Sequence, residues 1–172
     1  MATVITQAKL TDVPVLSEIG RLSFIESHGT SAQESDINSY VKKAYNHETI
    51  KAEIENPENN YYLIIENGTP AGFSKMQLNT GHSNIQLSNV CKLDRIYLLK
   101  EFYNLNLGRE LLNFNLELAK QNNQSGMWLF VWKDNTRAVN FYKKLNFEVI
   151  GTYEFKLTET HSNPNYQMLL KW

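Results

Sequence analysis

Apolar positions in the first 60 residues recur mainly at the three- and four-residue spacing of amphipathic helices. A short apolar stretch at 4–6 predicts a strand, and a helix is expected to begin after Thr11-Asp12 and to end before Gly29. Residues 27–33 are small and polar and predict a loop. Two further helices are predicted, one capped by Ser35-Asp36 and one over 47–55.

The pattern changes to strands after Pro57. Two apolar stretches, 61–66 and 71–78, are separated by Asn67-Gly68, a pair typical of the tight turn in a β-hairpin. Two longer blocks follow, 93–112 and 128–147, and each predicts an apolar strand that leads through a short polar turn into a helix. The strands are expected at 90–98 and 127–132, and the helices after Gly108 and over 135–145. Strands at 147–157 and 166–171 close the chain.

This order predicts one domain of the mixed α/β (α+β) class, spanning 1–172, with helices on both faces of a central sheet. Each strand–turn–helix block places a helix N-terminus where a strand ends. The free N–H groups and the positive dipole end of such a helix bind anions well. The turns around Gly108 and Asp134-Asn135 are therefore candidate ligand sites.

Composition narrows the class of protein. Apolar residues make up 42% of the chain and charged residues 20%, which is ordinary for a globular protein. The net charge is −1 and there is no basic run, which disfavours nucleic acid as the main partner. The single cysteine, Cys91, lies in an apolar strand and predicts a buried thiol and no metal site built on cysteines. No stretch approaches the ~20 apolar residues of a membrane span, so a soluble cytoplasmic protein without a membrane partner is expected.

The two blocks resemble the acetyl-CoA-binding half of the GCN5-related N-acetyltransferase superfamily. The second contains Asn135-x-x-Ala138-x-x-Phe141-Tyr142-Lys143-Lys144-Leu145-Asn146-Phe147, which is similar to the family signature N-x-x-A-x-x-F-Y-x-K-x-G-F. The first contains Tyr103-Asn104-Leu105-Asn106-Leu107-Gly108-Arg109, a degraded form of Q/R-x-x-G-x-G/A. Within the superfamily, the DRIYL and WLFVW strands and the chain length most resemble the bacterial spermidine/spermine N-acetyltransferases.

Asparagine stands where the family has glycine at Asn106 and again at Asn146. Asparagine adopts left-handed backbone angles more readily than other non-glycine residues. We therefore predict a positive φ at both positions.

The resemblance implies an acyl-CoA N-acyltransferase fold with a mostly antiparallel sheet, and acetyl-CoA as the cosubstrate without a metal. The implied contacts to the cofactor come from three places: the backbone of the fourth strand, the phosphate turn and the last helix. They are Ile96, Tyr97, Leu98, Tyr103, Asn104, Leu105, Asn106, Leu107, Gly108, Arg109, Asn135, Ala138, Phe141 and Lys144. For Asn135, capping of its helix is an equally good alternative to a cofactor contact. For Arg109 and Lys144, the equally good alternative is a solvated cation on the surface.

Two residues are candidates for catalysis. Tyr142 has the phenol needed to protonate a departing thiolate. Asp94 lies in the fourth strand, where the family often places a carboxylate, and is the candidate base; a structural ion pair with Arg95 or a lysine is the alternative.

His28 in the first loop can titrate near neutral pH, but a lone histidine in a loop is more often a surface residue. Trp128 and Trp132 share one face of their strand, and core packing is preferred for Trp128.

The resulting prediction is an N-acetyltransferase that moves an acetyl group to a primary amine, a polyamine being favoured, by direct attack in a ternary complex. A homodimer is possible. The rival prediction is a non-catalytic acyl-CoA-binding regulatory module, against which the retained Tyr142 argues. A nucleotide-binding α/β domain is a second rival, but no glycine-rich dinucleotide or P-loop motif is present.

Overall fold

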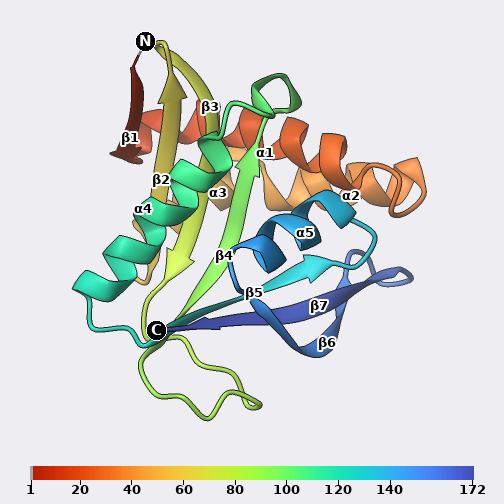
Figure 1. Cartoon of the computed structure of the whole chain (residues 1–172). Helices are drawn as coiled ribbons and strands as arrows, with labels where there is room; N and C mark the ends of the chain where they lie inside the picture. The colour runs from red at the N-terminus through yellow and green to blue at the C-terminus, as the bar shows by residue number, and fades with distance from the viewer. Residues whose placement is uncertain (1) are drawn as a thin grey trace.

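Seven strands form one sheet, in the order β1-β2-β3-β4-β5-β7-β6, in the computed structural model, which describes residues 2–172 (Figure 1). The strands are β1 (Thr3–Gln7), β2 (Asn59–Glu66), β3 (Thr69–Gln77), β4 (Val90–Leu98), β5 (Gly126–Trp132), β6 (Glu148–Lys156) and β7 (Ser162–Lys171). Every neighbouring pair is antiparallel except β4 and β5. The predicted mixed class and mostly antiparallel sheet are confirmed.

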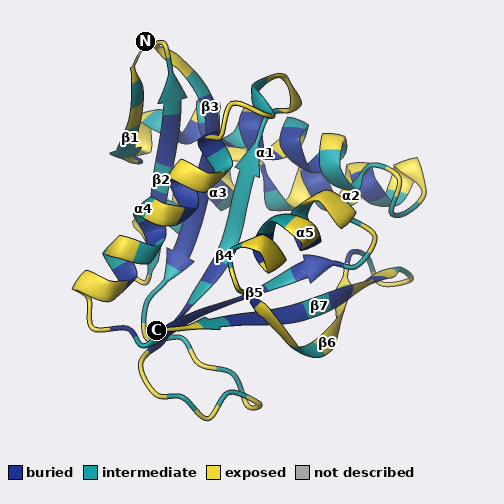
Figure 2. Ribbon diagram, in the orientation of Figure 1, coloured by how far each residue is buried: buried dark blue, intermediate teal, exposed yellow. Residues whose placement is uncertain are grey.

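Helices cover both faces of this sheet (Figure 1). One face carries α1 (Val13–His28), α2 (Glu34–Ala44) and α3 (His47–Glu55), preceded by the short 3-10 turn η1 (Leu10–Asp12). The other face carries α4 (Leu107–Gln121), which follows the 3-10 turn η2 (Lys100–Phe102), and α5 (Thr136–Lys144). Each helix turns its apolar stripe to the sheet and its polar face to solvent, which Figure 2 shows as buried and exposed bands.

Two main apolar clusters hold these layers together. The cluster under α1–α3 includes Leu16, Phe24, Ile50 and Phe73, and the cluster under α4 and α5 includes Leu112, Met127, Leu129 and Met168. The thiol of Cys91 lies in the second cluster, and burial raises its pKa to about 12, so the prediction of a buried thiol is confirmed.

The sheet opens in the middle, where β4 and β5 diverge. The two strands pair with each other only over Val90–Lys92 and Gly126–Trp128; beyond these residues β4 remains paired with β3 and β5 with β7, and the two halves of the sheet separate (Figure 1). Backbone N–H and C=O groups beyond Lys92 on that side of β4 lack a strand partner, and such an edge is a template for an extended ligand that carries amide groups. The divergence thus creates a place for a ligand in the centre of the sheet.

Local backbone angles agree with the sequence at both asparagines. The φ angle is 64° at Asn106 and 68° at Asn146, so the predicted left-handed conformation is confirmed. The first helix, α1, ends before Gly29 as predicted, so the loop predicted at 27–33 was wrong for Ser27 and His28, which form the last turn of α1. Helix α2 begins at Glu34, ahead of the predicted Ser35-Asp36 cap, and has no side-chain cap; β7 begins at Ser162, four residues earlier than expected. The early start of β7 follows from its pairing with β6, a contact that local sequence does not determine.

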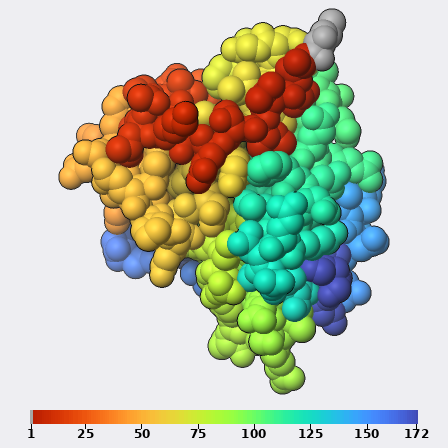
Figure 3. Space-filling model, turned by 90° about the vertical axis from the view of Figure 1, so that its left-hand side faces the viewer, coloured from red at the N-terminus to blue at the C-terminus, as the bar shows by residue number. Residues whose placement is uncertain are grey.

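The connection between β3 and β4 projects from the body of the molecule and is seen from two directions in Figures 1 and 3. Figure 3 also shows the N-terminal segment next to residues of β2 and α4, at the edge of the sheet away from the β4–β5 opening. None of the helices within residues 2–172 is long and apolar enough to cross a membrane.

Candidate active site

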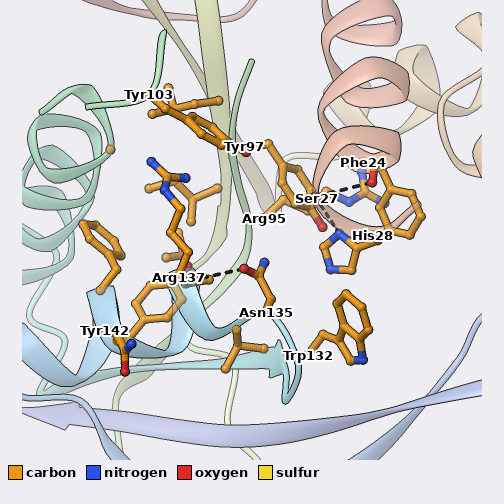
Figure 4. Close-up of a pocket in the computed structure, with 18 of the residues that line it drawn as sticks. Phe24, Ser27, His28, Arg95, Tyr97, Tyr103, Trp132, Asn135, Arg137 and Tyr142 are labelled. Carbon is orange, nitrogen blue, oxygen red and sulfur yellow. Dashed lines mark hydrogen bonds between the residues drawn. The ribbon is translucent and has the colours of Figure 1, made fainter. Parts of the chain in front are cut away.

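A cavity of about 860 Å³ occupies the opening between β4 and β5. Its walls come from the C-terminal end of α1, the N-terminal ends of α4 and α5, and residues of β4, β5 and β7 (Figure 4). Fifteen of the sixteen predicted site residues line it; the exception is Leu105, whose side chain is 52% exposed and lies outside the cavity.

One end of the cavity is the turn that leads into α4. Asn104 and Asn106 both have left-handed φ angles, 65° and 64°, and the side chain of Asn106 does not cap the helix. The first N–H groups of α4, from Leu107 and Gly108, therefore have no side-chain partner at the cavity wall. Left-handed residues in a turn and an uncapped helix N-terminus are both arrangements that bind phosphate.

Three cations line the cavity to which this turn belongs. Arg109 from α4 and Lys144 from α5 line the cavity, as does Arg137, which the sequence analysis did not single out. The guanidinium of Arg137 lies 3.5 Å from the centroid of the Tyr103 ring, a close cation–π contact. Tyr103, where the family has glutamine or arginine, thus holds a cation beside the phosphate turn. The signal in the sequence was the position of Arg137 in the first turn of α5, two residues after Asn135.

The N-terminus of α5 closes the same wall. The side chain of Asn135 accepts a hydrogen bond of 3.3 Å from the N–H of Ala138, so the capping alternative is confirmed (Figure 4). Ala138, Phe141 and Tyr142 line the cavity along the following turns. Tyr142 is buried, and burial raises its pKa, so its phenol keeps its proton at neutral pH. A protonated phenol at this wall can serve as a proton donor.

A β-bulge in β4 lies at the middle of the cavity. Lys75 of β3 pairs with Arg95 and Met76 pairs with Leu93, which leaves Asp94 without a partner residue in β3. Bulges of this kind are common next to active sites because they redirect side chains and free backbone groups. Here the bulge brings the Asp94 side chain beside that of Lys75.

Asp94 is part of a buried network of charges. Its carboxylate lies 3.1 Å from the ammonium of Lys75 and 2.8 Å from that of Lys92. Burial alone would raise the pKa of Asp94, but the two lysines lower it to about 2. An ionised carboxylate with so low a pKa is a weak proton acceptor. The ion-pair alternative is thus the observed state, and the assignment of Asp94 as the base stays a prediction without support from this geometry.

The rest of the network ties β4 to α3 and β2. The guanidinium of Arg95 donates to Glu53 at 2.9 Å and to the Tyr61 hydroxyl at 3.0 Å, and Tyr61 in turn donates to Glu53. Lys75 lies 3.6 Å from the same carboxylate. With three cations and two carboxylates, the network carries a net charge of 3 − 2 = +1 on the α1–α3 side of the sheet.

The opposite end of the cavity is lined by aromatic rings. His28 lies between Phe24, at a centroid distance of 4.5 Å, and Trp132, at 5.6 Å (Figure 4). The expectation of a surface position for His28 was wrong: the ring lies in the cavity wall, because α1 packs across β3 and β4 and its last turn contacts Tyr97 of β4 and Trp132 of β5. Trp132 lines the cavity, whereas Trp128 is in the core and donates to the carbonyl of Thr80 at 2.7 Å, as preferred for it.

Amide side chains from β7 complete this end. Asn163 donates to the hydroxyl of Ser31 at 2.8 Å, which ties β7 to the connection between α1 and α2. Asn165 lines the cavity, and its buried Oδ1 has no hydrogen-bond partner within residues 2–172. An unpaired buried amide oxygen can accept a hydrogen bond from a bound ligand. Sequence reasoning missed both asparagines, because only the early start of β7 brings them here.

No group of three or more histidine, cysteine or acidic side chains in residues 2–172 is placed to hold a metal ion. The cavity combines an anion-binding turn, strand backbone without a partner on the side of β5, a protonated phenol, the charged network around Asp94 and an aromatic pocket.

Comparison with known proteins agrees with this geometry. The family model of the acetyltransferase (GNAT) family matches residues 25–147. The chain is 30% identical over 153 residues to an uncharacterized N-acetyltransferase from Lactobacillus delbrueckii subsp. lactis, which covers 89% of this chain and 88% of that one. It is 24% identical over 156 residues to a spermidine N(1)-acetyltransferase from Thermoplasma acidophilum, which covers 88% of this chain and 92% of that one.

Solved structures show the same fold. A PaiA N-acetyltransferase from Thermoplasma acidophilum, crystallised with coenzyme A, superposes with a TM-score of 0.81 at 22% identity over the full length of both chains. The ribosomal-protein-S18-alanine N-acetyltransferase from Escherichia coli superposes with a TM-score of 0.68 at 18% identity, over 99% of this chain and 94% of that one. With a family model that matches well over half of its residues, the chain belongs to the acetyltransferase (GNAT) family and is an acetyl-CoA-dependent N-acetyltransferase.

Proposed function

We propose that the protein transfers the acetyl group of acetyl-CoA to a primary amine by direct attack in a ternary complex, without a covalent enzyme intermediate. The observation that carries the proposal is a single cavity that runs from the N-terminus of α4, through the opening between β4 and β5, to the aromatic pocket at the end of α1. Such a cavity can hold both substrates at once, with the thioester in the opening.

The cofactor follows from the chemistry of the walls. Its pyrophosphate is assigned to the turn at 103–109, whose uncapped N–H groups are supplemented by Arg109, Arg137 and Lys144. Its pantetheine arm is assigned to the backbone of 96–98, where β4 pairs with β3 but has no partner strand on the side of β5. A backbone N–H near the bulge at Asp94 would then polarise the thioester carbonyl and stabilise the tetrahedral oxyanion.

The acid in this proposal is Tyr142. Its phenol is protonated at neutral pH and lies in the cavity wall formed by α5, so it can donate to the departing thiolate. Asp94 is assigned a supporting role, because the two lysines that hold it ionised also fix the bulge on which the thioester would lie.

A polyamine is the first acceptor to test, because of the resemblance in sequence and the spermidine acetyltransferase among the relatives. The charges disfavour binding of a polycation in the aromatic pocket at the end of α1, where the amine would bind. The buried network of charges beside this pocket carries a net charge of +1, and both of its carboxylates are already paired. Amino compounds with a single amine, among them peptide N-termini and lysine side chains, are therefore the alternative acceptors.

The test is acetyl-CoA consumption across a panel of polyamines, amino acids, lysine peptides and peptides with free N-termini, with the acetylated product identified by mass spectrometry. Turnover of at least one amine supports the proposal. Tight binding of CoA in calorimetry without turnover of any amine would instead favour a non-catalytic acyl-CoA-binding module. Sedimentation of the same preparation tests the predicted homodimer.

A further inference from the structure

The ring of His28 is held in one orientation by three aromatic neighbours. Its ring is stacked on that of Phe24 with an interplanar angle of 5°, and on that of Trp132 with an interplanar angle of 29°. It also makes an edge-on contact with the ring of Tyr97 at a centroid distance of 6.1 Å. Contacts on several sides leave the imidazole little freedom to rotate. A side chain fixed in this way in the wall of an active-site cavity presents the same nitrogen to any ligand there (Figure 4).

The hydroxyl of Ser27 lies against one of the two ring nitrogens, Nδ1, and leaves Nε2 without a hydrogen-bond partner. The Ser27 hydroxyl has one hydrogen, and it donates to the carbonyl of Ser23 at 2.7 Å. The same oxygen lies 2.6 Å from Nδ1 of His28 and is then free only to accept there. With the hydroxyl hydrogen on that carbonyl, Nδ1 carries the proton and Nε2 keeps an unshared electron pair, and no group within residues 2–172 forms a hydrogen bond with Nε2; this tautomer is the one that the proposal below requires.

The other titratable groups of the cavity are less suited to accept a proton. Asp94 is held ionised by Lys75 and Lys92. Tyr97 and Tyr142 are phenols whose pKa values burial raises, so they are proton donors at neutral pH. Glu26 is exposed at the rim and accepts the backbone N–H of Lys100 at 2.7 Å.

From this geometry we propose that His28 is the general base of the acetyl transfer and that Ser27 is a positioning residue that keeps Nε2 unprotonated. The inference rests on the proposed function. The neutral amine forms a bond to the thioester carbon, the carbon–sulfur bond breaks, and the proton of the attacking nitrogen passes to Nε2. The thiolate takes a proton from Tyr142, and water returns the proton of the imidazolium to the phenolate.

Burial lowers the pKa of His28 to about 4, which keeps the ring neutral at physiological pH and makes it a weak base, though a stronger one than Asp94, whose pKa is about 2. The groups that face the ring are Phe24 and Ser27 from α1, Tyr97 from β4 and Trp132 from β5, and none of them is charged near neutral pH. A weak base suffices, because a nitrogen that has attacked the carbonyl bears positive charge and is far more acidic than a free ammonium.

Activity tests the base with variants that keep the packing. His28→Phe preserves the stack on Phe24 and removes the nitrogen, so kcat should fall about 10²-fold or more while the Kd for CoA stays within about twofold. His28→Ala should lower kcat by as much, but added imidazole should restore part of it, because the space left by the ring can hold an imidazole molecule. His28→Phe fills that space and is the matched control that imidazole should not rescue.

A second measurement does not need turnover. Nitrogen chemical shifts of the histidine ring should show His28 of the wild-type protein neutral and protonated on Nδ1 between pH 6 and 8, and Ser27→Ala should mix the two tautomers. Full kcat in His28→Phe, or an Nε2–H tautomer in the wild type, would overturn the role of His28 and leave the proposed function standing. A wild-type enzyme that acetylates no amine would overturn both.

Discussion

Gly108 offers a direct test of the phosphate turn, because its replacement separates binding from folding. It is the second residue of α4 and has no left-handed backbone angle. A Cβ atom there would lie 3.5 Å from Leu98 Cδ1 and 3.9 Å from Phe141 Cζ, which are ordinary contacts. The fold therefore has room for a side chain at this position, and we expect Gly108→Ala and Gly108→Asp both to fold.

The expected change in stability is small and favourable. Alanine is better than glycine in a helix by up to about 1 kcal/mol, and an aspartate in the first turn gains about 0.3–1 kcal/mol from the helix dipole. The free energy of unfolding in urea should thus stay the same or rise slightly for both variants.

The expected change in binding is large. The N–H groups of Leu107 and Gly108 open into the cavity beside three cations, where the pyrophosphate is assigned. A carboxylate at Gly108 would repel this group and block its approach to the backbone. One lost charged contact is worth about 1–3 kcal/mol, and about 1.4 kcal/mol is tenfold in affinity, so Gly108→Asp should raise the Kd for CoA tenfold or more. Gly108→Ala should raise it less.

Isothermal titration calorimetry with CoA measures the effect, with the unfolding curve of the same sample as the check on folding. Gly81→Asp is a matched control, because nothing lies within 4 Å of the position of its Cβ and it belongs to the projecting connection before β4. Unchanged CoA affinity in the folded Gly108→Asp variant would remove this turn from the binding site.

Three further outcomes are expected. Tyr142→Phe should lower kcat about 10²-fold at nearly unchanged affinity for CoA, and full activity would make the ring a packing residue. Asn146→Ala should lower the free energy of unfolding by about 1 kcal/mol, because φ is 68°, whereas Asn146→Gly should be neutral; equal urea midpoints would contradict this. The folded-state pKa of Asp94 is about 2 against an ordinary 3.8, so its stabilisation, about 2 kcal/mol, should be complete above about pH 4 and be lost as the pH falls toward 2. Asp94→Asn should remove that part of the pH dependence of the urea midpoint.

Local features of this protein could be predicted from the sequence because they depend on neighbours along the chain. The left-handed angles at Asn106 and Asn146 follow from the special backbone freedom of asparagine next to a helix end. The strand predicted at 90–98 has the same two ends as β4, because a run of apolar and β-branched residues bounded by polar ones specifies a strand. The motif after Asn135 likewise predicted a helix, and the structure has a capped helix whose Tyr142 lines the cavity.

Contacts between distant segments decided the rest of the site. Whether Asp94 is a base or an ion pair depends on Lys75, nineteen residues earlier in the chain, and on a bulge that exists only in the pairing of β3 with β4. The place of His28 in the wall depends on α1 packing against β4 and β5, and Asn165 enters the site only because β7 pairs along its whole length with β6.

The sequence by itself thus determined the order of the elements, the acetyltransferase signature and the backbone conformation of the turns, because spacing and backbone preference act over a few residues. Only the tertiary structure decided how β4 and β5 part, which charges neutralise one another and which distant side chains line the cavity. Burial, strand register and proton sharing depend on atoms that the chain brings together from far apart in its length, and a local pattern carries no record of them.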